Sequence, residues 1–156
     1  MDKICDLEAE TGLEIRKAEA NDLQACTHIY ANGWNTARPD IPRRISLRDF
    51  QSETEGELIL VAVRGGQILG FVSIWEPDWF IHLLYVDPAL HREGYGIALI
   101  AHAKRLANGQ SLSLKCQREN IGATGFYEAL GFVEDADHGV DQYGAWVRLV
   151  KANSVD

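Results

Sequence analysis

The chain has 156 residues, of which 46% are hydrophobic, so it is long and apolar enough to form one domain with a substantial core. Its formal net charge of −8, without a basic stripe, argues against a nucleic-acid-binding protein. The acidic N-terminus lacks the apolar segment of a signal peptide, and no stretch reaches the length of a membrane helix. Three widely spaced cysteines, Cys5, Cys26 and Cys116, indicate neither a disulfide framework nor a zinc site. We therefore expect a cytoplasmic protein with no bound metal and no membrane or nucleic-acid partner.

Hydrophobic periodicity divides the chain into strands and helices. Residues 1–12 are predicted to form a polar extension and 13–150 a single domain. The predicted strands cover 13–16, 58–63, 68–75, 80–86, 112–116, 132–133 and 143–150, and the predicted helices cover 23–30, 46–55, 97–107 and 120–130, with a loop at 33–42. Several strands are apolar on both faces, which is typical of a sheet covered by helices on both sides. The element order therefore predicts an α+β fold in three αβα layers.

The segment from Leu84 to Ile97 has the strongest functional pattern. It reads as the end of a strand, a turn at Pro88, and a loop with Gly94 and Gly96 that opens a helix. The first amides of a helix have no partner inside it, and the helix dipole is positive at that end. Glycines remove the side chains that would keep a phosphate away from those amides. The segment therefore predicts a binding loop for a phosphorylated ligand.

A second block lies about 25 residues downstream. Residues 120–132 have the form N-x-x-A-x-x-F-Y-x-x-x-G-F. Together the two blocks resemble the GNAT superfamily of N-acetyltransferases, which bind acetyl-CoA. The resemblance is sharp over 80–97 and 120–132, and the order of elements extends it over about 13–150. It implies a mixed, mostly antiparallel sheet that splays between its fourth and fifth strands, acetyl-CoA as co-substrate, and a homodimer as a common assembly.

The resemblance implies a set of coenzyme-binding residues. The amides of Leu84 and Val86 are expected to pair with the pantetheine arm in the manner of an added strand. The family loop begins with Gln or Arg where this chain has His91, so Arg92 is the candidate for the fixed positive charge. The full set is Leu84, Tyr85, Val86, His91, Arg92, Glu93, Gly94, Tyr95, Gly96, Ile97, Asn120, Ala123 and Tyr127.

Acetyl transfer to an amine needs a proton acceptor, a donor to the carbonyl oxygen and an acid for the departing thiolate. By resemblance, Tyr127 is the candidate acid and the Leu84 amide the carbonyl donor. His82 is the candidate base, because it lies two residues before Leu84 and alternation predicts that it points to the same side. A structural role for His82 stays open, and so do Glu76 and Asp78 as bases acting through water. Direct transfer is preferred to an acyl-enzyme on Cys116, which has no base beside it in sequence.

The acceptor is expected to be a primary amine of a small molecule or peptide. Trp34, Trp75, Glu76 and Trp79, together with Arg38, are predicted to flank the mouth of its site, although the tryptophans could instead cover the sheet or a dimer surface. Two other functions stay open. One is an acyl-CoA sensor of the same fold without turnover. The other is a dinucleotide-binding domain, which is disfavoured because residues 94–99 lack the third glycine of G-x-G-x-x-G.

Overall fold

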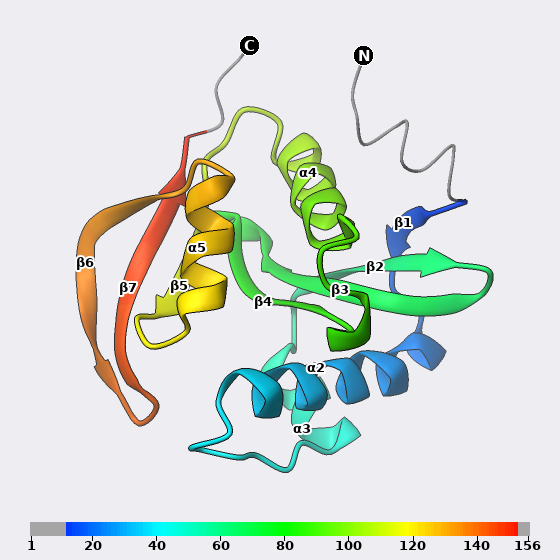
Figure 1. The fold of residues 1–156 in the computed structure, drawn as a ribbon. Coiled ribbons are helices and arrows are strands. Elements are labelled where there is room, and N and C mark those ends of the chain that lie inside the picture. The colour runs from blue at the N-terminus through cyan, green and yellow to red at the C-terminus, as the bar shows by residue number, and fades with distance from the viewer. Residues whose placement is uncertain (1–11, 153–156) are drawn as a thin grey trace.

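The computed structural model describes residues 12–152, which form one seven-stranded sheet and four α-helices (Figure 1). The sheet order is β1-β2-β3-β4-β5-β7-β6. The strands are β1 (Glu14–Lys17), β2 (Leu58–Arg64), β3 (Gln67–Trp75), β4 (Phe80–Val86), β5 (Leu112–Gln117), β6 (Val133–Asp141) and β7 (Gly144–Lys151). The helices are α2 (Leu23–Ala37), α3 (Leu47–Glu53), α4 (Tyr95–Ala107) and α5 (Ile121–Ala129). Of the predicted extension, residues 1–11, including Cys5, lie outside the described residues.

Helices cover both faces of the sheet, as the apolar strands predict. In Figure 1, α4 and α5 lie on one side and α2 and α3 on the other. Each side has its own buried cluster. The α4 side is built around Ile74, Ile81, Leu99 and Leu114, and the α2 side around Tyr30, Phe50, Phe71 and Leu83. The α+β fold in three layers is therefore confirmed. No helix within residues 12–152 is long and apolar enough to cross a membrane.

The sheet parts between its two central strands. Every neighbouring pair is antiparallel except β4 with β5, which is parallel. That pair matches only Phe80 with Ser113 and Ile81 with Leu114, so the strands diverge after Ile81. The predicted mixed and splayed sheet is present. This topology contradicts a dinucleotide-binding domain, whose sheet is mostly parallel.

The helix predicted over 23–30 extends to Ala37, so the expectation of a loop from residue 33 was wrong. Gly33 lies inside the helix and is buried because it packs against a ring: a Cβ there would lie 2.3 Å from Cδ1 of Tyr85. The Tyr85 ring is held in turn by Tyr30, at 5.0 Å between ring centroids, and by Phe71, at 6.1 Å. Gly33 thus allows α2 to lie close to β4. The strand β6 is also longer than predicted, because its polar residues do not show the hydrophobic alternation of a strand.

Gly33→Ala should destabilise the protein. Alanine favours a helix over glycine by about 1 kcal/mol, but forced overpacking of a core costs about 1–3 kcal/mol. Because the Tyr85 ring is held on both sides, we expect a net loss of about 1–2 kcal/mol in the free energy of unfolding, measured by urea denaturation.

Gly125→Ala is the matched control, since Gly125 lies inside α5 and a Cβ there would meet no atom within 4 Å beyond its chain neighbours and its own helix backbone. It should gain about 0.5–1 kcal/mol. Equal changes in the two variants would contradict the close approach of α2 to β4.

Candidate functional site

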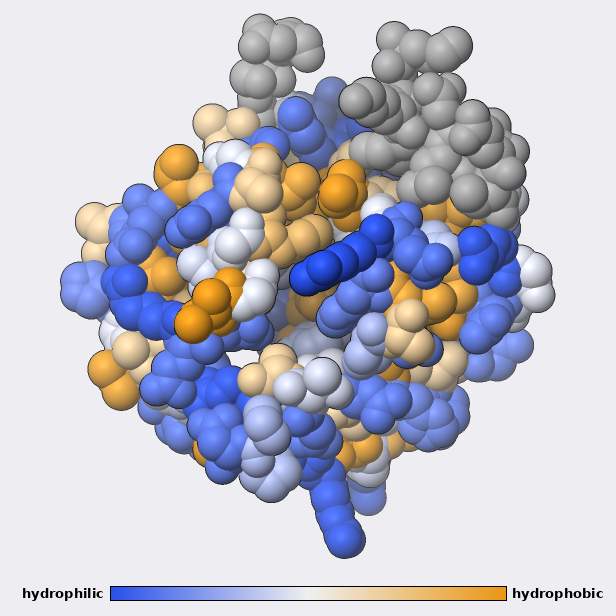
Figure 2. All heavy atoms as spheres, in the orientation of Figure 1, coloured by the Kyte–Doolittle hydropathy of each residue, from blue (hydrophilic) through white to orange (hydrophobic). Residues whose placement is uncertain are grey.

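Two adjoining cavities open where β4 and β5 part. The first, of about 790 Å³, lies between the end of β4, the loop before α4, and α5. The second, of about 550 Å³, lies between α2, β4, β5 and the turn between β6 and β7. Figure 2 shows the surface hollowed between α4 and α5, above α2. Six residues line both cavities, which are Ala37, Leu84, Tyr85, Asn120, Ala123 and Tyr127.

The backbone of β4 offers hydrogen-bonding groups to the gap. In an antiparallel pair, the N–H and C=O of one residue point to the same neighbouring strand, and successive residues point to opposite sides. The Asp87 amide donates to Leu69 O at 2.9 Å, so Asp87 faces the β3 side. Leu84 and Val86 lie an odd number of residues before Asp87, so their backbone groups face the β5 side, where pairing has ended. The first cavity is thus bordered by backbone donors and acceptors that the sheet does not use.

The loop before α4 directs further amides toward the first cavity. Arg92 has φ 70° and Gly94 has φ 89°, and such left-handed residues turn successive N–H groups into one concavity. The buried Tyr95 anchors the start of α4 in the core. Gly96 also lines this cavity, and a Cβ there would lie 3.1 Å from Cζ of Phe126. The glycine is required because α4 and α5 approach each other closely at this point.

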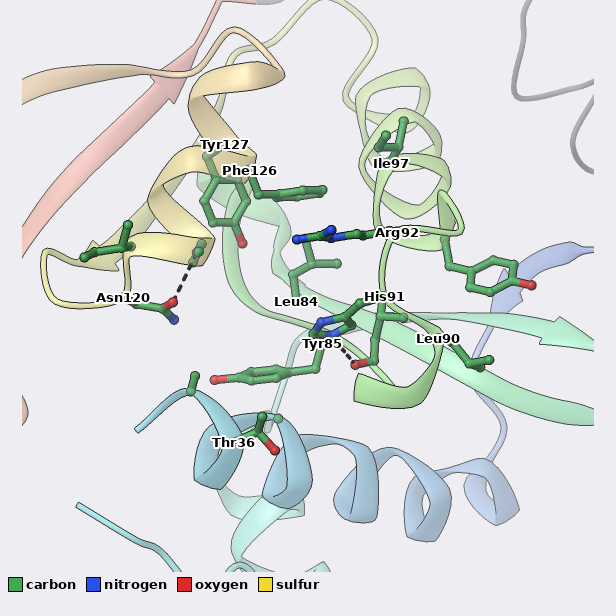
Figure 3. A pocket seen from close by; sticks show the side chains of 18 of the residues that line it. Thr36, Leu84, Tyr85, Leu90, His91, Arg92, Ile97, Asn120, Phe126 and Tyr127 are labelled. Atoms are coloured by element: carbon green, nitrogen blue, oxygen red, sulfur yellow. Dashed lines mark hydrogen bonds between the residues drawn. The ribbon is translucent and has the colours of Figure 1, made fainter. Parts of the chain in front are cut away.

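The side chains of the loop have different roles. His91 Nε2 lies 3.1 Å from Val86 O; because a carbonyl accepts, the ring donates and fixes the loop to the strand end. The Arg92 side chain extends across the opening toward α5 (Figure 3). Glu93 is exposed and is not among the residues that line the cavity. Arg92 therefore provides the positive charge that the loop presents.

Tyr127 occupies the boundary of the two cavities. Its ring packs edge-on against Phe126 and Phe132, with centroids 5.2 and 5.5 Å away, and its hydroxyl points into the opening beside Leu84 (Figure 3). Burial raises the pKa of this phenol well above its ordinary value, so it stays protonated at neutral pH. Asn120 caps α5 by accepting a hydrogen bond from the Ala123 amide at 3.1 Å, as predicted.

Cys116 lines the second cavity but lacks the surroundings of a nucleophile. Burial raises the pKa of its thiol. Its hydrogen-bonding neighbours are the hydroxyl of Thr124, at 3.6 Å, and the carbonyl of Gln117, at 3.7 Å, and neither is a base. Because the thiolate is the reactive form, this environment does not favour an acyl-enzyme.

Aromatic rings and a cation of the chain itself form the wall of the second cavity. The Arg43 guanidinium lies 4.8 Å from the ring centroid of Trp34 and 5.4 Å from those of Tyr30 and Tyr143. It also donates to the Tyr30 hydroxyl at 2.7 Å and to Glu53 at 2.6 Å. Trp34 therefore lines the second cavity, but its ring already contacts this internal cation.

Arg38 lines the same cavity and is almost completely buried. It pairs with Asp40 at 2.9 Å and Glu119 at 3.1 Å, and it donates to Gln117 and to Tyr143 O. The other residues expected at the mouth, Trp75, Glu76 and Trp79, line neither cavity. Trp75 ends β3, and Glu76 and Trp79 belong to the turn that follows, at the end of β4 that still pairs with β5. Arg38 therefore belongs to an internal ion-pair network, and Trp75, Glu76 and Trp79 lie where β3 turns into β4.

His82 lines the second cavity, but the alternation argument for its direction was wrong. Ser73 pairs with Leu83 and Ile74 pairs with Ile81, so His82 is an extra residue in a β-bulge. Its Nδ1 lies 2.9 Å from Glu57, a residue of the loop before β2. Sequence analysis missed Glu57, as it missed Arg43. Glu57 lies 25 residues from its partner, and no local pattern marks such a pair.

Across residues 12–152, no group of three or more His, Cys, Asp or Glu side chains is placed to hold a metal ion. The candidate site is therefore described by backbone amides, Tyr127, His82 and the ion pairs of the second cavity.

Comparison with known proteins identifies the family of this chain. The family model described as the acetyltransferase (GNAT) family matches residues 22–132. No curated protein matches the chain. Three similar solved structures show the same fold at low sequence identity. They are the ribosomal-protein-S18-alanine N-acetyltransferase of Escherichia coli (24% identity, 92% of this chain and 96% of that one, TM-score 0.72), YncA of Salmonella typhimurium with acetyl-CoA (20%, 92% and 95%, 0.70), and the PaiA N-acetyltransferase of Thermoplasma acidophilum with coenzyme A (18%, 87% and 97%, 0.71).

The family model covers more than half of the chain and includes both α4 and α5, the helices that border the first cavity. The two parting strands, β4 and β5, and the glycine loop lie in the same region. The chain belongs to the GNAT family of acetyltransferases.

Proposed function

We propose that this protein transfers the acetyl group of acetyl-CoA directly to a primary amine of a small molecule or a peptide. The observation that carries the proposal is the meeting of two cavities at Leu84 and Tyr127, where β4 leaves β5. One cavity has the donors for a phosphorylated coenzyme, and the other can admit a second substrate. Two similar structures were solved with acetyl-CoA or coenzyme A, which supports the choice of coenzyme.

The first cavity fits coenzyme A by its chemistry. The amides at 94–97 and the Arg92 guanidinium offer donors and positive charge suited to the pyrophosphate. The backbone of Leu84 and Val86 offers the pairing groups of a strand edge to the amide-containing pantetheine arm. Its volume, about 790 Å³, is within the usual range for small-molecule sites. When bound, the coenzyme supplies an activated acetyl thioester at the boundary of the cavities.

The residues at that boundary can assist acetyl transfer. The Leu84 amide can donate to the acetyl oxygen as negative charge develops on it. The Tyr127 hydroxyl, protonated because it is buried, can give its proton to the sulfur as the C–S bond breaks. His82, in the wall of the second cavity, can take a proton from the incoming ammonium group.

The acceptor belongs in the second cavity. Its wall is aromatic at Tyr30, Trp34 and Tyr143, and its cations are already paired with acids, as Lys115 is with Asp141 at 2.6 Å. Such a wall suits an acceptor with an apolar or aromatic part next to its amine. The similar E. coli enzyme is a ribosomal-protein-S18-alanine N-acetyltransferase, which makes a peptide amine a reasonable acceptor to test. A cytoplasmic location and a homodimer remain sequence-based predictions.

Amine-dependent release of free thiol from acetyl-CoA tests the proposal directly. The purified protein is assayed with a panel of small primary amines and of peptides with free N-termini, and N-acetyl products are identified by mass spectrometry. Thiol release that requires both the protein and one of these amines supports the proposal. Tight binding of acetyl-CoA without release for any amine would instead identify a non-catalytic acyl-CoA sensor.

Coenzyme A should raise the melting temperature. At a concentration 100 times Kd, binding adds about 2.7 kcal/mol of stability, which corresponds to roughly 5–10 °C for a domain of this size. NAD and ATP, which lack the pantetheine arm, should shift it much less, and so should pantetheine, which lacks the pyrophosphate.

Gly96→Leu should abolish the shift caused by coenzyme A, because a side chain there meets Phe126 and covers the helix amides. Gly125→Leu, outside the cavity lining, should keep it. Equal shifts in the two variants would place the coenzyme elsewhere.

Tyr127→Phe should keep coenzyme binding and lower turnover. The phenyl ring preserves the packing against Phe126 and Phe132, but the proton for the sulfur is lost. We expect kcat to fall by about 100-fold or more, the usual contribution of a general acid. The coenzyme-induced thermal shift should stay close to that of the wild type. A variant with wild-type kcat across the pH range would exclude Tyr127 as the acid.

A further inference from the structure

The bulge at His82 changes which way β4 presents its side chains. Ile81 and Leu84 both pack against the α4-side cluster although they are three residues apart, whereas Leu83 belongs to the α2-side cluster. A regular strand would put residues of odd spacing on opposite faces. The extra residue thus turns His82 away from the α4 side, toward the loop that precedes β2 and toward the second cavity.

Glu57 holds the imidazole from that loop. His82 Nδ1 lies 2.9 Å from both carboxylate oxygens of Glu57. The hydroxyl of Ser73 donates to the same carboxylate from β3, and Ser73 is fully buried. The Glu57 side chain is 9% exposed and that of His82 is 34% exposed, so the carboxylate is enclosed while the ring reaches the cavity. Three residues from three different elements therefore form one continuous polar chain.

The contact with Glu57 decides which ring nitrogen of His82 carries the proton. An ionised carboxylate has only acceptors, so Nδ1 of His82 must be the donor. In the neutral ring the lone pair is then on Nε2, at the other edge of the imidazole. Because Nδ1 is engaged with Glu57, Nε2 is the nitrogen left to accept a proton from a molecule in the second cavity. A histidine without such a partner can carry its proton on either ring nitrogen.

We infer that Glu57 is the positioning residue of the acetyl transfer: it fixes His82 in the Nδ1–H tautomer and aims Nε2 at the acceptor amine, with Ser73 holding the carboxylate. The inference rests on the proposed function, and it adds a residue and a tautomer to it. Glu57 lines neither cavity, so it acts through His82. Its negative charge also stabilises the imidazolium that forms when Nε2 takes the proton.

The proton balance of the step is complete. The acceptor enters as an ammonium ion, and one N–H bond breaks as His82 Nε2 takes that proton and returns it to water. The free amine then forms the C–N bond as the C–S bond breaks, and the Tyr127 hydroxyl gives its proton to sulfur. The nitrogen loses its second proton, which restores Tyr127 through solvent. The products are the N-acetylated amine, the free thiol of the coenzyme and one proton.

Nitrogen-15 NMR of labelled histidine tests the tautomer without any turnover. The chain has five histidines, and loss of one set of signals in His82→Ala assigns this residue. In the wild type, neutral His82 should show the pattern of an Nδ1–H tautomer. In Glu57→Ala the signals should change toward the Nε2–H form. A wild-type ring in the Nε2–H form would overturn the inference.

Kinetics test whether Glu57 acts through His82. Glu57→Ala should lower kcat by about 10- to 100-fold, the range found when a residue that orients a metal-binding histidine is lost, while KM for the acceptor changes little. In a His82→Ala background the same change should have no further effect, because the ring it positions is absent. An equal loss in both backgrounds would show that Glu57 contributes only to structure.

Milder variants cover the case in which Glu57→Ala fails to fold. Ser73→Ala should lower kcat by a smaller factor in the wild-type background and by none with His82→Ala. Glu55→Gln, which changes an exposed carboxylate in the same loop, is the matched control and should leave kcat unchanged.

If no amine is acetylated at all, the proposed function fails, whereas the NMR experiment still decides whether Glu57 fixes the tautomer of His82.

Discussion

The structure depends on one interruption of backbone pairing. After Ile81, β4 continues beside β3 but loses β5. A buried strand edge without partners is costly, because each backbone N–H or C=O left without a hydrogen bond loses about 1–3 kcal/mol. Here the edge opens on a cavity, so water or a ligand can satisfy the backbone groups of Leu84 and the amide of Val86, while Val86 O accepts from His91. The same feature that weakens the sheet creates a binding edge with strand geometry.

The rest of the fold keeps that gap open. The two buried clusters hold the sheet from opposite faces, and β7 supports β5 from its far side through six paired residues. The Tyr85 ring lies against Gly33 of α2, which fixes how closely this helix approaches β4. On the other side, Gly96 sets the approach of α4 to Phe126 of α5. Two glycines therefore set the spacing of the helices around the cavities.

Sequence reasoning pointed to the lining residues of the first cavity that are close together in the chain. The strand, loop and helix from Leu84 to Ile97 lie next to one another in sequence, and so do Asn120 and Tyr127 on α5, so periodicity and motif spacing could find them. It failed where a contact joins distant segments. The pair of His82 and Glu57 joins β4 to the loop before β2, and Arg43 meets Trp34 only because α2 continues past Gly33.

The errors have physical causes. A loop was predicted over 33–42, but α2 continues through Gly33, and the close packing of this glycine against Tyr85 outweighs its poor helix propensity. The direction of His82 was inferred from strict alternation, and a bulge interrupts it. Trp75, Glu76 and Trp79 were expected at the mouth because they are close to β4 in sequence, yet they lie at the end where β4 and β5 remain paired. Neither bulges nor the point of strand divergence can be read from a single sequence.

Amide hydrogen exchange at β4 tests the central claim most directly. The account predicts that the amides of Leu84 and Val86 exchange readily in the free protein and become protected when coenzyme A binds. The Asp87 amide, which donates to Leu69 O at 2.9 Å, should be protected in both states and serves as the internal reference. If coenzyme A binds and yet leaves the exchange rates of Leu84 and Val86 unchanged, the parted strands are not its binding edge.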